Sequence, residues 1–111
     1  MITQELFNYE QAALASFESA VRQSHVCKQL NREVARLEGK LEQLHDIAVL
    51  AARRSDKIED VAAIWKTMTE ICEHFAQRIR DLAKAHPDCE TSYDKVLDLL
   101  NDCKERHEFH A

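Results

Sequence analysis

Four side chains near the carboxyl end of the chain have the types and order of zinc ligands. They are His86, Cys89, Cys103 and His107, which together form the pattern H-x2-C-x13-C-x3-H. Zinc requires its ligands within a few ångströms of one another. On a straight helix Cys103 lies about 20 Å from the level of Cys89, and no hairpin is predicted to close that gap. We therefore interpret these residues as separate surface and core positions, and we predict no metal site.

A second thiol arrangement follows from folding the chain back at Pro87. This fold places Cys72 level with Cys103, and both cysteines occupy apolar positions of their segments. We interpret them as two small thiols packed in a helix interface, because buried cysteine is usually inert. The alternative function is a metal-binding or thiol-redox helical bundle that uses Cys72, Cys103 and His107. Cys89 lies off any apolar seam and is expected to be an exposed thiol.

Carboxylates and histidines suggest a further possibility, a di-metal site inside a helical bundle. Such a site needs two Glu-x-x-His motifs and two more inward-facing glutamates. Glu42 and His45 form one such motif, and Glu70 with Glu73 and His74 offers only a distorted second. The chain also lacks a P-loop, a dinucleotide fingerprint and a nucleophile elbow. We predict no catalytic residue, no cofactor and no small-molecule substrate, which indicates a protein that is not an enzyme.

The elements that must position these residues are helices. The chain has 111 residues, one glycine and one proline, so it has little material for the tight turns of a sheet. Residues 1–111 are predicted to form a single all-α domain, an antiparallel helical bundle with coiled-coil-like seams. The net charge of −5 argues against a nucleic-acid partner, since affinity for nucleic acid depends on neutralising phosphates.

The amino terminus lacks the basic start and the apolar stretch of a secretory signal. The longest apolar run, residues 47–52, is too short to cross a bilayer, so no membrane association is expected. These features indicate a cytoplasmic protein whose four cysteines are reduced.

Two helices are bounded clearly. The first covers residues 56–86, where Ser55 and Asp56 offer N-cap oxygens and Glu59 forms a capping-box arrangement with Asp56. The second covers residues 90–107, after Pro87 interrupts the helix, and Asp88 or Thr91 caps it. The apolar repeat of the helix predicted over residues 56–86 is Ile58, Val61, Trp65, Met68, Cys72, Phe75, Ile79 and Leu82. The predicted core consists of Leu37, Leu41, Leu44, Ile58, Trp65, Met68, Phe75, Ile79 and Leu82.

Residues 3–54 contain no helix breaker, but their apolar spacing slips near Ser24. We favour one continuous helix over residues 3–54, which gives three long helices and a rod of about 75 Å. The alternative is a turn near Ser24 and a four-helix bundle.

If the helix over residues 3–54 is continuous, the remaining helices are too short to cover its amino-terminal apolar face. We therefore expect a partner to bind there through Leu6, Phe7, Leu14, Phe17 and Val21. The leading hypothesis is a non-enzymatic interaction module, such as an adaptor, a chaperone-like protein or an assembly subunit. Its first expected partner is a second copy in a homodimer, and the other is a different helical protein.

Charged residues form two stripes along residues 28–46. Lys28, Arg32, Arg36 and Lys40 recur every four residues, and Glu38, Glu42 and Asp46 lie beside them. The simplest interpretation is a solvated face, and the alternative is a docking surface for an acidic helix or a phosphate backbone. The acidic segment after Pro87 is the expected intramolecular neighbour of the basic stripe.

Overall fold

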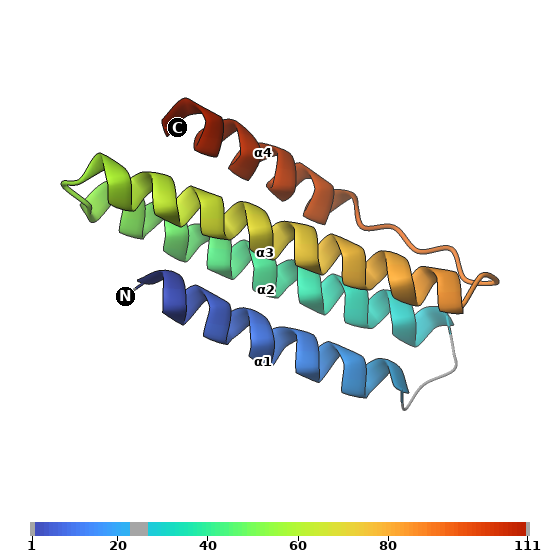
Figure 1. Ribbon diagram of the computed structural model, residues 1–111. Helices are drawn as coiled ribbons and strands as arrows, with labels where there is room; N and C mark the ends of the chain where they lie inside the picture. Colours follow the sequence, from blue (N-terminus) through green and yellow to red (C-terminus); the bar gives the residue numbers. More distant parts are fainter. Residues whose placement is uncertain (1, 23–26, 111) are drawn as a thin grey trace.

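The structure is a computed structural model that describes the backbone of residues 2–22 and 27–110, and their side chains except those of residues 18–22. These ranges form four helices, which are labelled in Figure 1: α1 (Ile2–Arg22), α2 (Cys27–Arg54), α3 (Ile58–Ala85) and α4 (Asp94–His110). Successive helices run in opposite directions. The predicted all-α antiparallel bundle is confirmed.

The bundle is arranged around the α2–α3 pair. Both α1 and α4 contact α2 and α3, and within the described ranges they make no contact with each other. The outer helices therefore lie on opposite sides of the central pair (Figure 1). This arrangement gives α3 three neighbouring helices, so it must present apolar side chains in several directions.

The prediction of one continuous helix over residues 3–54 is wrong. The helices end at Arg22 and begin again at Cys27, and α1 lies antiparallel against α2. The largest extent of the molecule is 48 Å, well short of the rod that a continuous helix requires. The four-helix alternative is therefore right, while the predicted turn residue, Ser24, lies outside the described residues. Folding back buries the apolar face of α1 inside the chain itself.

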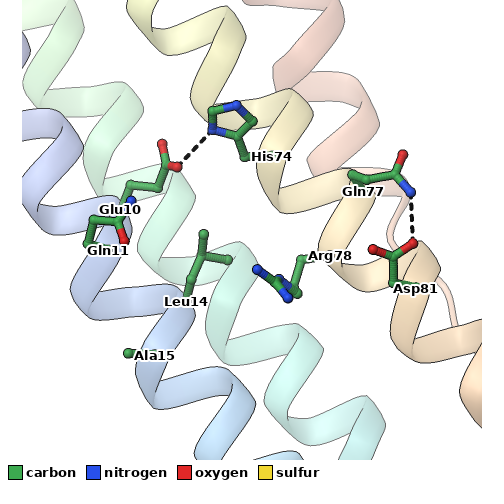
Figure 2. A pocket seen from close by; sticks show the side chains of 8 residues that line it. All are labelled: Glu10, Gln11, Leu14, Ala15, His74, Gln77, Arg78 and Asp81. Carbon is green, nitrogen blue, oxygen red and sulfur yellow. Dashed lines mark hydrogen bonds and ion pairs between the residues drawn. The ribbon is translucent and has the colours of Figure 1, made fainter.

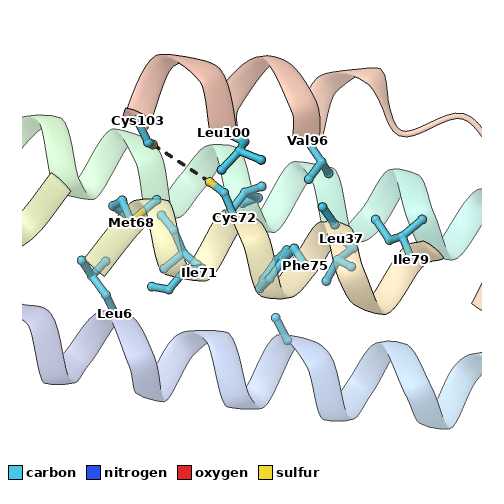
Figure 3. Packing of buried hydrophobic residues seen from close by; sticks show 14 of the residues in the cluster. Leu6, Leu37, Met68, Ile71, Cys72, Phe75, Ile79, Val96, Leu100 and Cys103 are labelled. Carbon is cyan, nitrogen blue, oxygen red and sulfur yellow. Dashed lines mark hydrogen bonds between the residues drawn. The ribbon is translucent and has the colours of Figure 1, made fainter. Parts of the chain in front are cut away.

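Figure 3 shows how α3 contributes to the core between the flanking helices. The predicted core positions Leu37, Leu41, Leu44, Trp65, Met68, Phe75 and Ile79 are all buried. Leu82 is partly buried against the same cluster. Ile58 is a correction: its side chain is 73 % exposed because it is the first residue of α3, at the end of the bundle.

The helix ends differ in detail from the prediction. Helix α3 follows Lys57, whose side chain makes no capping bond; of the two predicted cap residues, Ser55 accepts a hydrogen bond at its Oγ from the Lys57 amide at 3.4 Å. Helix α4 begins at Asp94 rather than residue 90, so neither Asp88 nor Thr91 caps it. It also continues beyond His107 to His110. Capping oxygens are frequent in loops, and so they locate a helix start only to within a few residues.

Two of the cysteines form a disulfide, which corrects the expectation of four reduced thiols. Cys27, the first residue of α2, is bonded to Cys89 in the connection between α3 and α4, with their Cα atoms 5.2 Å apart. Cys89 is consequently not an exposed thiol, and it packs against the core. The bond ties the α3–α4 connection to the start of α2.

Phe17→Ala is expected to destabilise the fold by about 3–5 kcal/mol, because its side chain is 3 % exposed and its removal leaves a cavity. Tyr9→Ala, on the same helix with 56 % of the residue exposed, is the control and should change stability little. Chemical unfolding measured by circular dichroism compares the two. Equal losses for both variants would contradict the placement of Phe17 in the core.

Replacing both Cys27 and Cys89 by serine is expected to lower the free energy of unfolding by about 4 kcal/mol. The disulfide closes a loop with a sequence separation of 62, and that constraint removes entropy from the unfolded chain. Guanidinium unfolding with and without a reductant tests this. Reductant should destabilise the unmodified protein and leave the double variant unchanged, since Cys72 and Cys103 are free in both. If reductant also destabilised the double variant, the loss of stability would not come from the Cys27–Cys89 disulfide.

Candidate binding groove and thiol cluster

The predicted partner face on α1 is mostly occupied by the chain itself. Leu6 is fully buried and Phe17 is 3 % exposed, so these two side chains belong to the internal core and are not available to a partner. Phe7 and Leu14 are partly buried against the same core. The side chain of Val21 lies outside the described residues. The expectation therefore fails for Leu6 and Phe17, because α1 packs onto α2 and α3.

A groove remains open between α1 and α2. It consists of two adjoining hollows of about 330 Å³ and 290 Å³, and both are lined by Ala13 and Lys40. Ala12, Ala13 and Ser16 are small, which leaves room between the helices. Leu44 and Ile47 also border one hollow, and Phe17 and Leu37 border the other, but Leu44, Phe17 and Leu37 are buried and present almost no surface to the groove. The groove is thus accessible from outside, and its accessible lining is a mixture of polar and apolar side chains.

Aromatic and basic side chains flank this groove. Tyr9 lines one hollow and is 56 % exposed. On the α2 side, Lys40 lines both hollows and Arg36 lines one, where it pairs with Glu33 at 3.1 Å. They belong to the basic stripe of Lys28, Arg32, Arg36 and Lys40, all four of which are exposed.

The basic stripe does not face α4 as expected. Helix α4 instead contacts the acidic stripe of α2, where Lys95 Nζ pairs with Glu42 at 2.5 Å. Burial raises the pKa of Glu38, against the effect of hydrogen bonds from the Val96 and Lys95 amides. The predicted neighbour of the basic stripe is therefore wrong, since the acids of α2 lie on the side toward α4.

The predicted contact between Cys72 and Cys103 is confirmed. Their Sγ atoms lie 4.0 Å apart between α3 and α4, and both residues are fully buried (Figure 3). The hydrogen bond with Cys103, together with burial, raises the pKa of the Cys72 thiol far above its ordinary value. The Cys72 thiol is thus held in its protonated form, and both sulfur atoms are shielded from solvent.

Polar residues adjoin this dithiol at the edge where α2, α3 and α4 meet. His45 Nε2 lies 2.6 Å from Asp102 Oδ2, and Arg106 Nε donates to the same oxygen at 2.9 Å. The Arg106 guanidinium lies over the ring of Trp65, 4.8 Å from its centroid. Although desolvation opposes it, the bonds from His45 and Arg106 lower the pKa of Asp102. This network fixes Asp102 as a carboxylate.

His45, Asp102 and Cys103 each have a potential ligand atom within 4.8 Å of the others. Among the described residues no other such group of three or more is formed, and His107 does not take part. The pattern of His86, Cys89, Cys103 and His107 does not assemble either, since Cys89 is in the disulfide. Sequence reasoning noticed His45 only as part of a Glu-x-x-His motif. It missed Asp102, whose only signal was its position next to Cys103.

A buried carboxyl group in α1 was also missed. Glu10 is 2 % exposed, and its Oε1 lies 2.8 Å from Nδ1 of the exposed His74 on α3. Figure 2 shows the pair at a groove of about 470 Å³ that Arg78 also lines. Glu10 occupies the missing seam position between Leu6 and Ala13, a pattern that was visible in the sequence.

The environment of Glu10 disfavours its ionised form. Desolvation raises its pKa, and the hydrogen bond and charge of His74 oppose that effect only in part. Its other oxygen, Oε2, is buried and has no hydrogen-bond partner among the described side chains. Burial of an unsatisfied polar atom costs free energy.

Comparisons with protein-family models, with curated proteins and with solved structures found no match for this chain. Within the described residues, no helix has both the length and the apolar composition needed to span a membrane.

Glu10→Gln is expected to gain stability relative to the unmodified protein as the pH rises from about 4. The folded protein binds the Glu10 proton more tightly than the unfolded chain does, so ionisation at higher pH costs folding free energy, which glutamine avoids. Unfolding curves at several pH values test this, with the exposed Glu5→Gln on α1 as the control. A difference between Glu10→Gln and the unmodified protein that does not change with pH would contradict the raised pKa.

Proposed function

We propose that the protein is a non-enzymatic helical interaction module that binds its partner in the groove between α1 and α2. The observation that carries this proposal is the exposed Tyr9 beside a partly apolar groove. A half-exposed aromatic residue next to an apolar hollow is a common anchor of protein interfaces. Small residues in α1 leave space for the side chains of an incoming helix.

The proposed partner presents an amphipathic helix with an acidic edge. Its apolar side chains fill the hollows shared by Ala13 and Lys40, as in helix-in-groove recognition. Its acidic edge lies along the basic stripe of α2, whose four cations are exposed. Opposite charges of this kind increase the association rate and set the orientation of the bound helix.

This charge distribution favours a different protein over a second copy. In a symmetric homodimer whose two-fold axis passes near the groove, the two basic stripes would come close to each other. Like charges placed opposite one another oppose association. The homodimer expected from the sequence is thus the less favoured form of the proposal, and light scattering should give the mass of one chain. A stable dimer that is lost in Tyr9→Ala would instead assign the groove to a second copy.

Site-specific photo-crosslinking tests where the partner binds. A photoreactive phenylalanine analogue at Tyr9 should give one defined adduct in a lysate from its native cells, and the yield should fall with added salt. The matched control places the same analogue at Asn101, an exposed position on α4. Equal adducts from both positions would contradict a specific groove.

Charge reversal tests the proposed acidic edge with the crosslinked partner in purified form. Arg36→Glu with Lys40→Glu should weaken binding at least about 10-fold at physiological salt and remove most of its salt dependence. Lys104→Glu on α4 is the control and should leave affinity unchanged. Isothermal titration calorimetry measures the affinity of the partner for the unmodified protein, the double variant and the control. Unchanged affinity in the double reversal would exclude an acidic helix as the ligand.

A further inference from the structure

A compact group of three side chains with metal-binding atoms, His45, Asp102 and Cys103, lies where α2, α3 and α4 come together, and Cys72 adjoins it through Cys103. His45 comes from α2, Cys72 from α3, and Asp102 and Cys103 are adjacent residues of α4. The two cysteines are fully buried, while the side chains of His45 and Asp102 are 14 % and 38 % exposed. The group thus has a closed thiol side and a side through which an ion can reach it.

The distances from Cys103 to the other three proposed ligands are close to those of a tetrahedral zinc site. Two thiolates on one zinc ion lie about 3.8 Å apart, since each Zn–S bond is about 2.3 Å long. The Sγ atoms of Cys72 and Cys103 are 4.0 Å apart. Ligand atoms of His45, Asp102 and Cys103 all lie within 4.8 Å of one another. A small movement of His45 Nε2 and the Asp102 carboxylate, now 2.6 Å apart, opens a position for the ion between them.

We propose that the protein binds one Zn²⁺ ion through Cys72, Cys103, His45 and Asp102. The ion forms bonds to two sulfur atoms, one imidazole nitrogen and one carboxylate oxygen, and the two thiol protons pass to solvent, with no change in oxidation state. Zinc suits this mixture because it accepts sulfur, nitrogen and oxygen ligands in tetrahedral geometry. Four protein ligands fill that geometry, as in a structural site.

The surroundings match the charge of such a site. Two thiolates and one carboxylate around Zn²⁺ leave one net negative charge, and Arg106 already contacts Asp102 at 2.9 Å. Arg106 is itself positioned over Trp65, whose ring lies 5.7 Å from that of His45. Groups of this kind orient metal ligands and affect metal affinity. The ion would join three helices at one point, and so it would add to the stability of the α4 contact.

Cobalt substitution provides the first test, with the untagged protein, its Cys27–Cys89 disulfide intact, after removal of metals by a chelator. One Co²⁺ per chain should give the intense visible bands of tetrahedral cobalt and a near-ultraviolet thiolate charge-transfer band. Added Zn²⁺ should abolish both signals stoichiometrically. Absence of one-to-one binding, or an octahedral cobalt spectrum, would overturn the proposal.

Ligand variants then test the assignment. Cys72→Ser should lose about half of the charge-transfer intensity, and Asp102→Asn and His45→Gln should each weaken Zn²⁺ affinity at least about 10-fold in competition with a chromophoric chelator. Asp102 is partly exposed, so its variant keeps the test valid even if a cysteine variant fails to fold.

His107→Ala is the matched control, because His107 is one helical turn after Cys103 and lies outside the cluster. It should leave the spectrum and the affinity unchanged. Loss of binding in this variant, or full binding in Asp102→Asn and His45→Gln, would assign the metal to other residues and overturn the proposed site.

Discussion

The packing of α3 against three neighbours is the interaction on which the rest of the structure depends. Helix α3 contacts α1, α2 and α4, and its buried residues include Ile64, Trp65 and Ile71. Because α1 and α4 do not contact each other within the described ranges, only the α2–α3 pair can hold them in place. Burial of the apolar faces of both outer helices therefore depends on α3.

Small or polar residues on α1 and α4 then determine which contacts and which open surfaces each outer helix has. The thiols of Cys72 and Cys103 let α3 and α4 approach closely, and the polar network of His45, Asp102 and Arg106 closes the edge of that contact. On the opposite side, α1 buries Glu10 in its seam and leaves a groove toward α2. The α4 side thus carries the proposed zinc site, and the α1 side carries the proposed partner groove.

The disulfide connects these two sides mechanically. Cys27 begins α2, which forms one wall of the groove, and Cys89 lies in the connection that leads into α4. A bond at this point limits how far α4 can move from the central pair. The groove and the thiol cluster are therefore held on one scaffold, although they are formed by different helices.

The apolar periodicity of the sequence was enough to predict the helical class and the long apolar seam of α3, because both depend on spacing along one helix. Together with the turn that Pro87 marks, it was also enough to predict that Cys72 faces Cys103. It failed where packing between helices decided the outcome. Residues 2–22 fold back if the free energy gained by burying Leu6 and Phe17 against α2 and α3 exceeds that of continuing the helix. No glycine or proline near this point indicates the outcome in the sequence. The meeting of His45 with Asp102 and the pairing of Cys27 with Cys89 join residues far apart in the sequence, so only the tertiary arrangement could bring them together.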